Sequence, residues 1–153
     1  MASFKFDGID YISASFEQLS SISDEEKMSI IRPAAEFLRA KYQETIRDKF
    51  RQITGTLAES ISIEQKSDDA GAYAHVAPKG KHPGSSTGKR KRRNGRSNGR
   101  YSGTNEEIAY ILNYGSPRIP PTHWLENANE EAADEIVAIE QQQWDELMTQ
   151  KGL

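Results

Sequence analysis

One segment near the middle of the chain does most to limit how the chain can fold. From Lys79 to Thr104 it reads KGKHPGSSTGKRKRRNGRSNGRYSGT, with nine Lys or Arg, six Gly and no Asp or Glu. Like charges this close together repel, and glycine adds backbone entropy, so we expect this basic segment to be mobile and to lie outside any core. The rest of the chain keeps eleven basic residues against 23 acidic ones, so an acidic protein carries one concentrated positive segment.

Composition limits the remaining 127 of the 153 residues to one domain with a lean core. Only 35% of the residues are hydrophobic and the mean hydropathy is −0.78, which suggests that some surface is buried against partners. The chain has no cysteine, which excludes disulfides and thiolate zinc sites. No apolar run is long enough to cross a membrane, and the first residues do not resemble a signal peptide. We therefore expect a soluble protein made in a cytosol.

The clearest secondary-structure signal is a long helix over residues 23–52. Ser23 followed by Glu26 forms a capping-box pattern, and one apolar stripe recurs at steps of three or four residues: Met28, Ile31, Ala35, Leu38, Tyr42, Ile46 and Phe50. Pro33 interrupts this pattern, because proline lacks an N–H and clashes with the preceding turn. The sequence therefore predicts either a kink just before Pro33 or a helix that restarts there.

Alternation of polar and apolar residues predicts a β-hairpin over residues 58–78, after a break at Thr54-Gly55 in which Gly55 caps the long helix. A short helix over residues 105–114 follows the basic segment and ends at Gly115. A proline-rich link leads to a C-terminal helix over residues 122–149, whose exposed side is acidic. The predicted fold class is α+β, with two long helices packed on a small antiparallel sheet and a long basic glycine-rich loop.

The first 22 residues are expected to form a strand or an arm. Phe4 to Ile9 alternates between apolar and polar residues, whereas Ile12, Phe16 and Leu19 have the i, i+4, i+7 spacing of a short helix. The simplest interpretation is a small element that pins the N-terminus to the core.

Catalytic motifs are not evident. The glycines of the basic segment fit neither a phosphate-binding loop nor a dinucleotide fingerprint, and no nucleophile elbow is present. His123 and Glu126 could share one face of a helix, but a metal site needs more ligands in a defined geometry. We therefore expect a protein that is not an enzyme and that uses no cofactor or metal.

The basic segment supplies the candidate contact residues. Clustered Lys and Arg neutralise phosphates and release counterions, which gives nucleic-acid binding without sequence preference. The same charges could instead dock on acidic protein, including the acidic helix of a neighbouring copy, act as a nuclear import signal, or form a solvated loop without a ligand. The residues proposed for nucleic-acid or partner contact are Lys79, Lys81, Lys89, Arg90, Lys91, Arg92, Arg93, Arg96 and Arg100.

Three short motifs outside the basic segment occur in a characteristic order. They are TGTLAESI after the long helix, NYGS at residues 113–116, and PTHWLENA at residues 121–128. In this order they resemble the head–tail joining, or tail-completion, proteins of long-tailed bacteriophages, of the minor tail protein Z type. Two features depart from that pattern: Gln52-Ile53 stands where many members have a proline or basic residue, and the basic segment is longer than expected.

The resemblance implies a structural virion protein of the phage neck. Its expected partners are copies of itself in a hexameric ring, the tail terminator and tail tube proteins, the head-closure or connector proteins, and phage DNA in the channel, with no membrane. It would act in the virion after assembly in the host cytoplasm. The alternative from another class is a small sequence-independent nucleic-acid-binding protein that acts through its basic segment.

Overall fold

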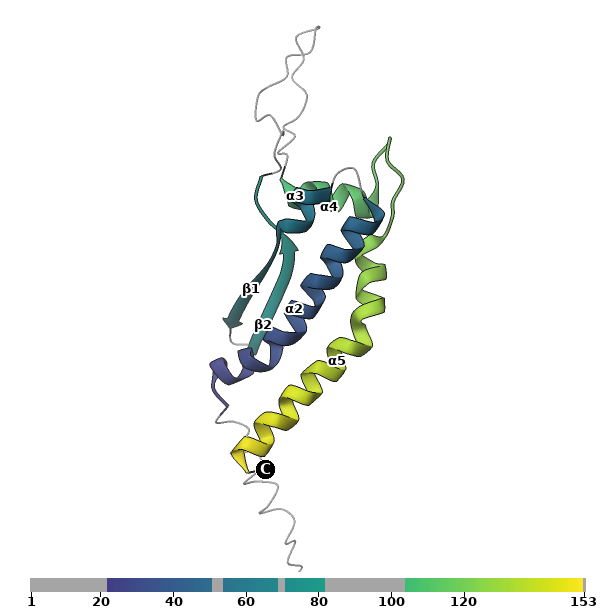
Figure 1. Cartoon of the computed structure of the whole chain (residues 1–153). Coiled ribbons are helices and arrows are strands. Elements are labelled where there is room, and N and C mark those ends of the chain that lie inside the picture. The colour runs from purple at the N-terminus through teal and green to yellow at the C-terminus, as the bar shows by residue number, and fades with distance from the viewer. Residues whose placement is uncertain (1–21, 51–53, 69–70, 82–103, 153) are drawn as a thin grey trace, which may run out of the picture.

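The computed structural model describes residues 22–50, 54–68, 71–81 and 104–152, and the N-terminal strand or arm expected before Ile22 lies outside them. The elements are α2 (Asp24–Lys49), α3 (Thr54–Glu59), β1 (Ile61–Asp68), β2 (Gly71–Pro78), α4 (Asn105–Tyr114) and α5 (Trp124–Lys151). Figure 1 shows the hairpin beside α2, with α5 running back along α2. The predicted α+β class, with long helices packed with a two-stranded antiparallel sheet, is confirmed.

Helix α2 begins where its capping sequence predicts. The Ser23 hydroxyl accepts from the Glu26 N–H, and the Glu26 carboxylate accepts from the Ser23 N–H at 2.8 Å, so both halves of the capping box are present. The helix runs through Pro33 without a break, so of the two predicted alternatives the restart at Pro33 is wrong. Burial of Ala34 and Ala35 directly after the proline shows that tertiary packing holds this turn in the helix.

The hairpin has one face against α2. Strand β1 pairs antiparallel with β2 from Ile61↔Pro78 to Asp68↔Gly71. Two side-chain hydrogen bonds join β1 to α2: the Arg32 guanidinium donates to Gln65, and the Ser67 hydroxyl donates to Asp24 at 2.7 Å. Because side chains alternate along a strand, Ile63 and Val76 share this covered face.

The junction between α2 and the hairpin differs from the sequence expectation. Residues Thr54–Glu59 form α3, a helix of 6 residues, where a break and the start of the hairpin were expected. Gly55 lies inside α3, so its predicted role as the left-handed cap of α2 is wrong, and Phe50 is the C-cap. Helix α3 buries Leu57 and Ala58 completely, and this burial explains why the short helix forms.

Helices α2 and α5 are antiparallel and joined by three side-chain contacts at two levels. Lys151 pairs with Glu26 at 2.9 Å, Lys41 pairs with Glu131 at 2.8 Å, and the Tyr42 hydroxyl donates to Asn129 at 2.5 Å. The hydrogen bond from Lys41 lowers the pKa of Glu131, and the same contact raises the pKa of Lys41. The first turn of α2 therefore lies beside the last turn of α5, as Figure 1 shows. Among the described residues, no helix is both long and apolar enough to cross a bilayer.

Candidate functional site

The two ends of the basic segment are held together by the backbone. Lys81 and Thr104 form an antiparallel bridge, and the Asn105 N–H donates to the Gly80 carbonyl at 2.9 Å. The buried Asn105 side chain donates to the Lys79 carbonyl at 2.8 Å. Gly80 adopts a φ of +84°, which a residue with a side chain rarely adopts. The segment therefore leaves and rejoins the fold at one point, which we call the base.

The structure describes two of the nine predicted contact residues. Lys79 forms an ion pair with Glu64, whose carboxylate also lies 3.6 Å from Lys66, so the charge of Lys79 is only partly offset within the fold. Lys81 is exposed at the base. The other seven, Lys89, Arg90, Lys91, Arg92, Arg93, Arg96 and Arg100, lie outside the described residues, as does the expected mobility of the segment.

Helix α4 begins directly at the base. The Thr104 hydroxyl accepts from the Glu107 N–H at 3.2 Å and caps the helix. Three large apolar side chains are exposed on α4 and in the turn that follows it: Tyr110 at 63%, Tyr114 at 50%, and Ile119 in the turn. The two tyrosine rings lie one helical turn apart with centroids 4.7 Å apart. We call these three exposed residues of α4 and its following turn the tyrosine patch, because exposed large apolar side chains of this kind are often covered by partner proteins.

Asn113 is a buried polar residue that links α4 to α5. Its side-chain oxygen accepts from the Leu125 N–H at 2.9 Å, and its side-chain nitrogen donates to the Glu126 carboxylate at 3.0 Å. The N-cap of α5 is His123, which has φ +49° and no capping side-chain bond. Asn113 therefore supplies from α4 the cap that α5 lacks locally.

The Glu126 carboxylate is held in place by its hydrogen bond from Asn113. Its own backbone N–H and the Asn113 amide lower its pKa, so the carboxylate is the favoured form. Among the described residues, no three His, Cys, Asp or Glu side chains gather closely enough to hold a metal. His123 and Glu126 lie in the first turn of α5, where His123 is the N-cap and the Glu126 carboxylate accepts from Asn113.

The first and third sequence motifs meet in one core, and the second motif lies beside it. Leu57, Ala58 and Ile61 come from the first motif, and Trp124 and Ala128 come from the third, and all five are almost fully buried. NYGS contributes the bonds of Asn113 and the C-cap of α4 at Gly115, whose φ is +81°. The motifs therefore build the frame from which the base and the tyrosine patch project.

Trp124 fixes the start of α5 within that core. Its indole N–H donates to the Ala109 carbonyl at 3.2 Å, and its ring meets Tyr42 edge-on with centroids 5.6 Å apart. These two contacts join α5 to α4 and α2. Ile61 of β1 lies in the same core cluster.

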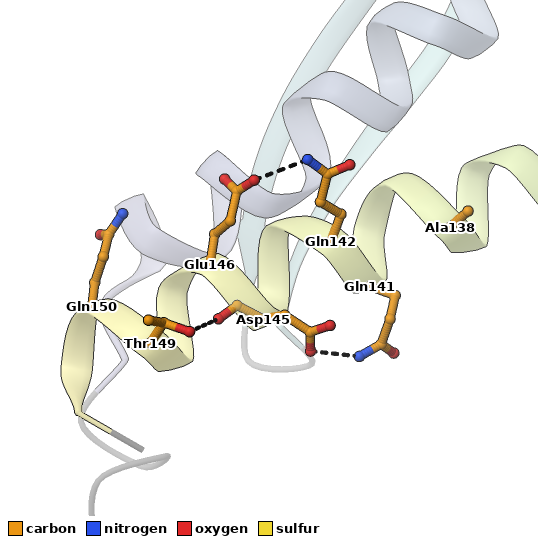
Figure 2. Close-up of a pocket in the computed structure, with 7 residues that line it drawn as sticks. All are labelled: Ala138, Gln141, Gln142, Asp145, Glu146, Thr149 and Gln150. Atoms are coloured by element: carbon orange, nitrogen blue, oxygen red, sulfur yellow. Dashed lines mark hydrogen bonds between the residues drawn. The ribbon is translucent and has the colours of Figure 1, made fainter.

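The acidic face predicted on the C-terminal helix is exposed along α5. Exposed carboxylates include Glu130, Glu131, Asp134, Glu135, Asp145 and Glu146. Near its C-terminus, a shallow depression is lined by seven residues of this one helix, from Ala138 to Gln150 (Figure 2). There Asp145 accepts from Gln141 at 2.8 Å, and Glu146 accepts from Gln142 at 2.9 Å. These polar groups pair with each other on an open surface. We therefore interpret the depression as part of a solvated helix face.

Comparisons of the chain with models of protein families, with curated proteins and with solved structures found no match.

Proposed function

We propose that the protein is a structural virion subunit of a long-tailed bacteriophage, a tail-completion protein that forms a ring and joins the tail to the head. Copies of the chain would contact each other through exposed apolar surface. The basic segment would face DNA in the channel or an acidic neighbouring ring. Its further partners would be tail terminator, tail tube and head-closure proteins.

The observation that carries this proposal is the convergence of the three motifs. Residues more than sixty positions apart in the sequence, such as Leu57 and Trp124, lie in one core cluster, and Asn113 of NYGS caps the helix that Trp124 begins. The motifs on which the resemblance rests therefore work as a single packing unit.

The exposed surface also supports an assembly subunit. The tyrosine patch leaves three large apolar side chains in solvent, which burial against a neighbouring copy would stabilise. The base of the basic segment precedes the same helix, α4, so contacts at the patch would also determine where the segment points. The exposed carboxylates of α5 offer the opposite charge to a basic segment from another copy.

The test is the size of the purified protein, measured by light scattering after size-exclusion chromatography and by electron microscopy. We expect a closed ring for the native chain and weakened assembly for a Tyr110→Ser, Tyr114→Ser double variant. Tyr73→Ser is the matched control, because Tyr73 is an exposed tyrosine on the outer face of the hairpin. A native chain that stays monomeric at every concentration, or that is absent from mature virions, would refute the proposal.

The second candidate function is sequence-independent nucleic-acid binding through the basic segment. The geometry of the base allows the segment to be removed in order to test this function. Because Lys81 and Thr104 already pair, residues 82–103 can be replaced by Asn-Gly, which closes a two-residue hairpin. If nucleic-acid binding is the function, the native chain binds DNA with a steep salt dependence and the shortened chain does not bind. If the neck function holds, the shortened chain still forms rings.

A further inference from the structure

A second exposed apolar surface lies on α5, away from the tyrosine patch. Val137 is 64% exposed and Trp144 is 36% exposed, although both are large apolar side chains. They are seven residues apart, and Lys151 follows after seven more, so the three lie on one stripe of the helix with only a small angular drift. We call Val137, Trp144 and Lys151 the α5 stripe.

Lys151, the C-terminal residue of the α5 stripe, lies close to Ile22, the residue at which the described chain begins. Lys151 pairs with Glu26 in the first turn of α2 at 2.9 Å, and Ile22 is buried just before that helix. Figure 1 shows the start of α2 and the end of α5 at the same end of the molecule. Ile22, to which the preceding 21 residues are joined, therefore lies near the Lys151 end of the stripe.

The sequence of those residues matches the stripe in chemistry and in spacing. Ile12, Phe16 and Leu19 would form one apolar face of a helix. The seven-residue step from Ile12 to Leu19 covers about 10 Å in a helix, as does the step from Val137 to Trp144. The three residues from Leu19 to Ile22 can span about 10 Å when extended, which brings Leu19 level with Trp144.

We propose that residues 12–19 of the same chain dock on the α5 stripe as a short amphipathic helix, with Ile12 near Val137 and Leu19 near Trp144. The short connection favours the segment of the same copy, because it holds the segment beside the stripe at high effective concentration. The docked segment would join the free ends of α2 and α5. This inference does not depend on the proposed function.

The test uses the absence of cysteine from the native chain. In the full chain, Ile12→Cys combined with Val137→Cys should form an intrachain disulfide under mild oxidation. Tyr11→Cys combined with Val137→Cys is the matched control, because position 11 is turned about 100° away on the same helix. We expect the first pair to close several-fold faster than the control pair, with a monomer band on a non-reducing gel.

The remaining outcomes contradict the proposal. A disulfide between two copies would assign the stripe to the arm of a second copy, and equal rates for the two pairs would mean that residues 12–19 do not recognise the stripe. A second measurement does not depend on engineered cysteines. Phe16→Ser should increase acrylamide quenching of the native tryptophan fluorescence, and it should have no such effect in a Trp144→Phe background, where buried Trp124 alone reports. Unchanged quenching would also reject docking.

Discussion

Removing the side chain of Asn113 should destabilise the protein more than any change of an exposed asparagine. The substitution Asn113→Ala removes the bond to the Leu125 N–H, which caps α5, and the bond to the Glu126 carboxylate. Loss of a helix cap costs about 1 kcal/mol, and loss of a hydrogen bond to a charged group costs about 1.5–3 kcal/mol. Because Asn113 is only 1% exposed, water does not readily replace either partner.

Together these terms predict a loss of about 3 kcal/mol in the free energy of unfolding. For a chain of this length that corresponds to a fall in Tm of about 6–12 °C. Urea unfolding followed by circular dichroism measures the free energy, and calorimetry measures Tm. Asn127→Ala is the control, because Asn127 is an exposed asparagine on the first turn of α5, and it should change stability by less than about 0.5 kcal/mol.

The isosteric variant Asn113→Asp separates the two bonds. An aspartate keeps an acceptor for the Leu125 N–H but places a negative charge against Glu126 at neutral pH. We expect Asn113→Asp to be destabilised at pH 7 and to recover part of that loss relative to the native chain as the pH falls and one carboxyl is protonated. If Asn113→Ala proved as stable as Asn127→Ala, the interpretation of Asn113 as the cap of α5 would be wrong.

Two further predictions follow from the backbone and from the ion pairs. Gly115→Ala should lower the free energy of unfolding by more than about 1 kcal/mol, measured by urea unfolding, because φ is +81° and a Cβ would lie 2.8 Å from the Ile119 carbonyl oxygen. Contacts with lysines lower the pKa of Glu26 and Glu131 below the ordinary 4.5, so their stabilisation is present above that value and is lost as the pH falls through the lowered pKa. Tm should therefore drop on acidification below about pH 4.5 and drop less in Glu131→Gln, and equal drops would contradict the role of this pair.

Local signals in the sequence were sufficient for the long elements. The capping box at Ser23 and the apolar stripe that follows it predict α2 nearly to its observed end, and alternation predicts the hairpin. Helix α3 was missed because six residues are too few to show a helical period, and its formation depends on burial of Leu57 and Ala58 in a core made by distant elements. Tertiary packing likewise carries Pro33 through the middle of α2.

The candidate site was less predictable because its geometry is built from residues distant in sequence. Rules for helix starts look for a cap immediately before the helix, where this chain has His123, whereas the cap of α5 comes from Asn113 on the preceding helix. One available signal was an asparagine directly before the Tyr-Gly that ends α4, combined with the poor local cap at His123. The ion pair between Lys79 and Glu64 was equally hidden, because β1 and β2 must pair before the two residues meet.

The architecture of the base bears on what the basic segment is for. The groups that close it are the backbone at Gly80 and Lys81, the Thr104 bridge and the buried Asn105 amide, and none of these is a basic side chain. Lys79 does pair with Glu64, a carboxylate that it shares with Lys66, so part of its charge is offset within the fold. Under the proposed function the basic segment would meet either nucleic acid or carboxylates such as those exposed along α5, and the salt dependence of binding, steep for counterion release from DNA, distinguishes the two.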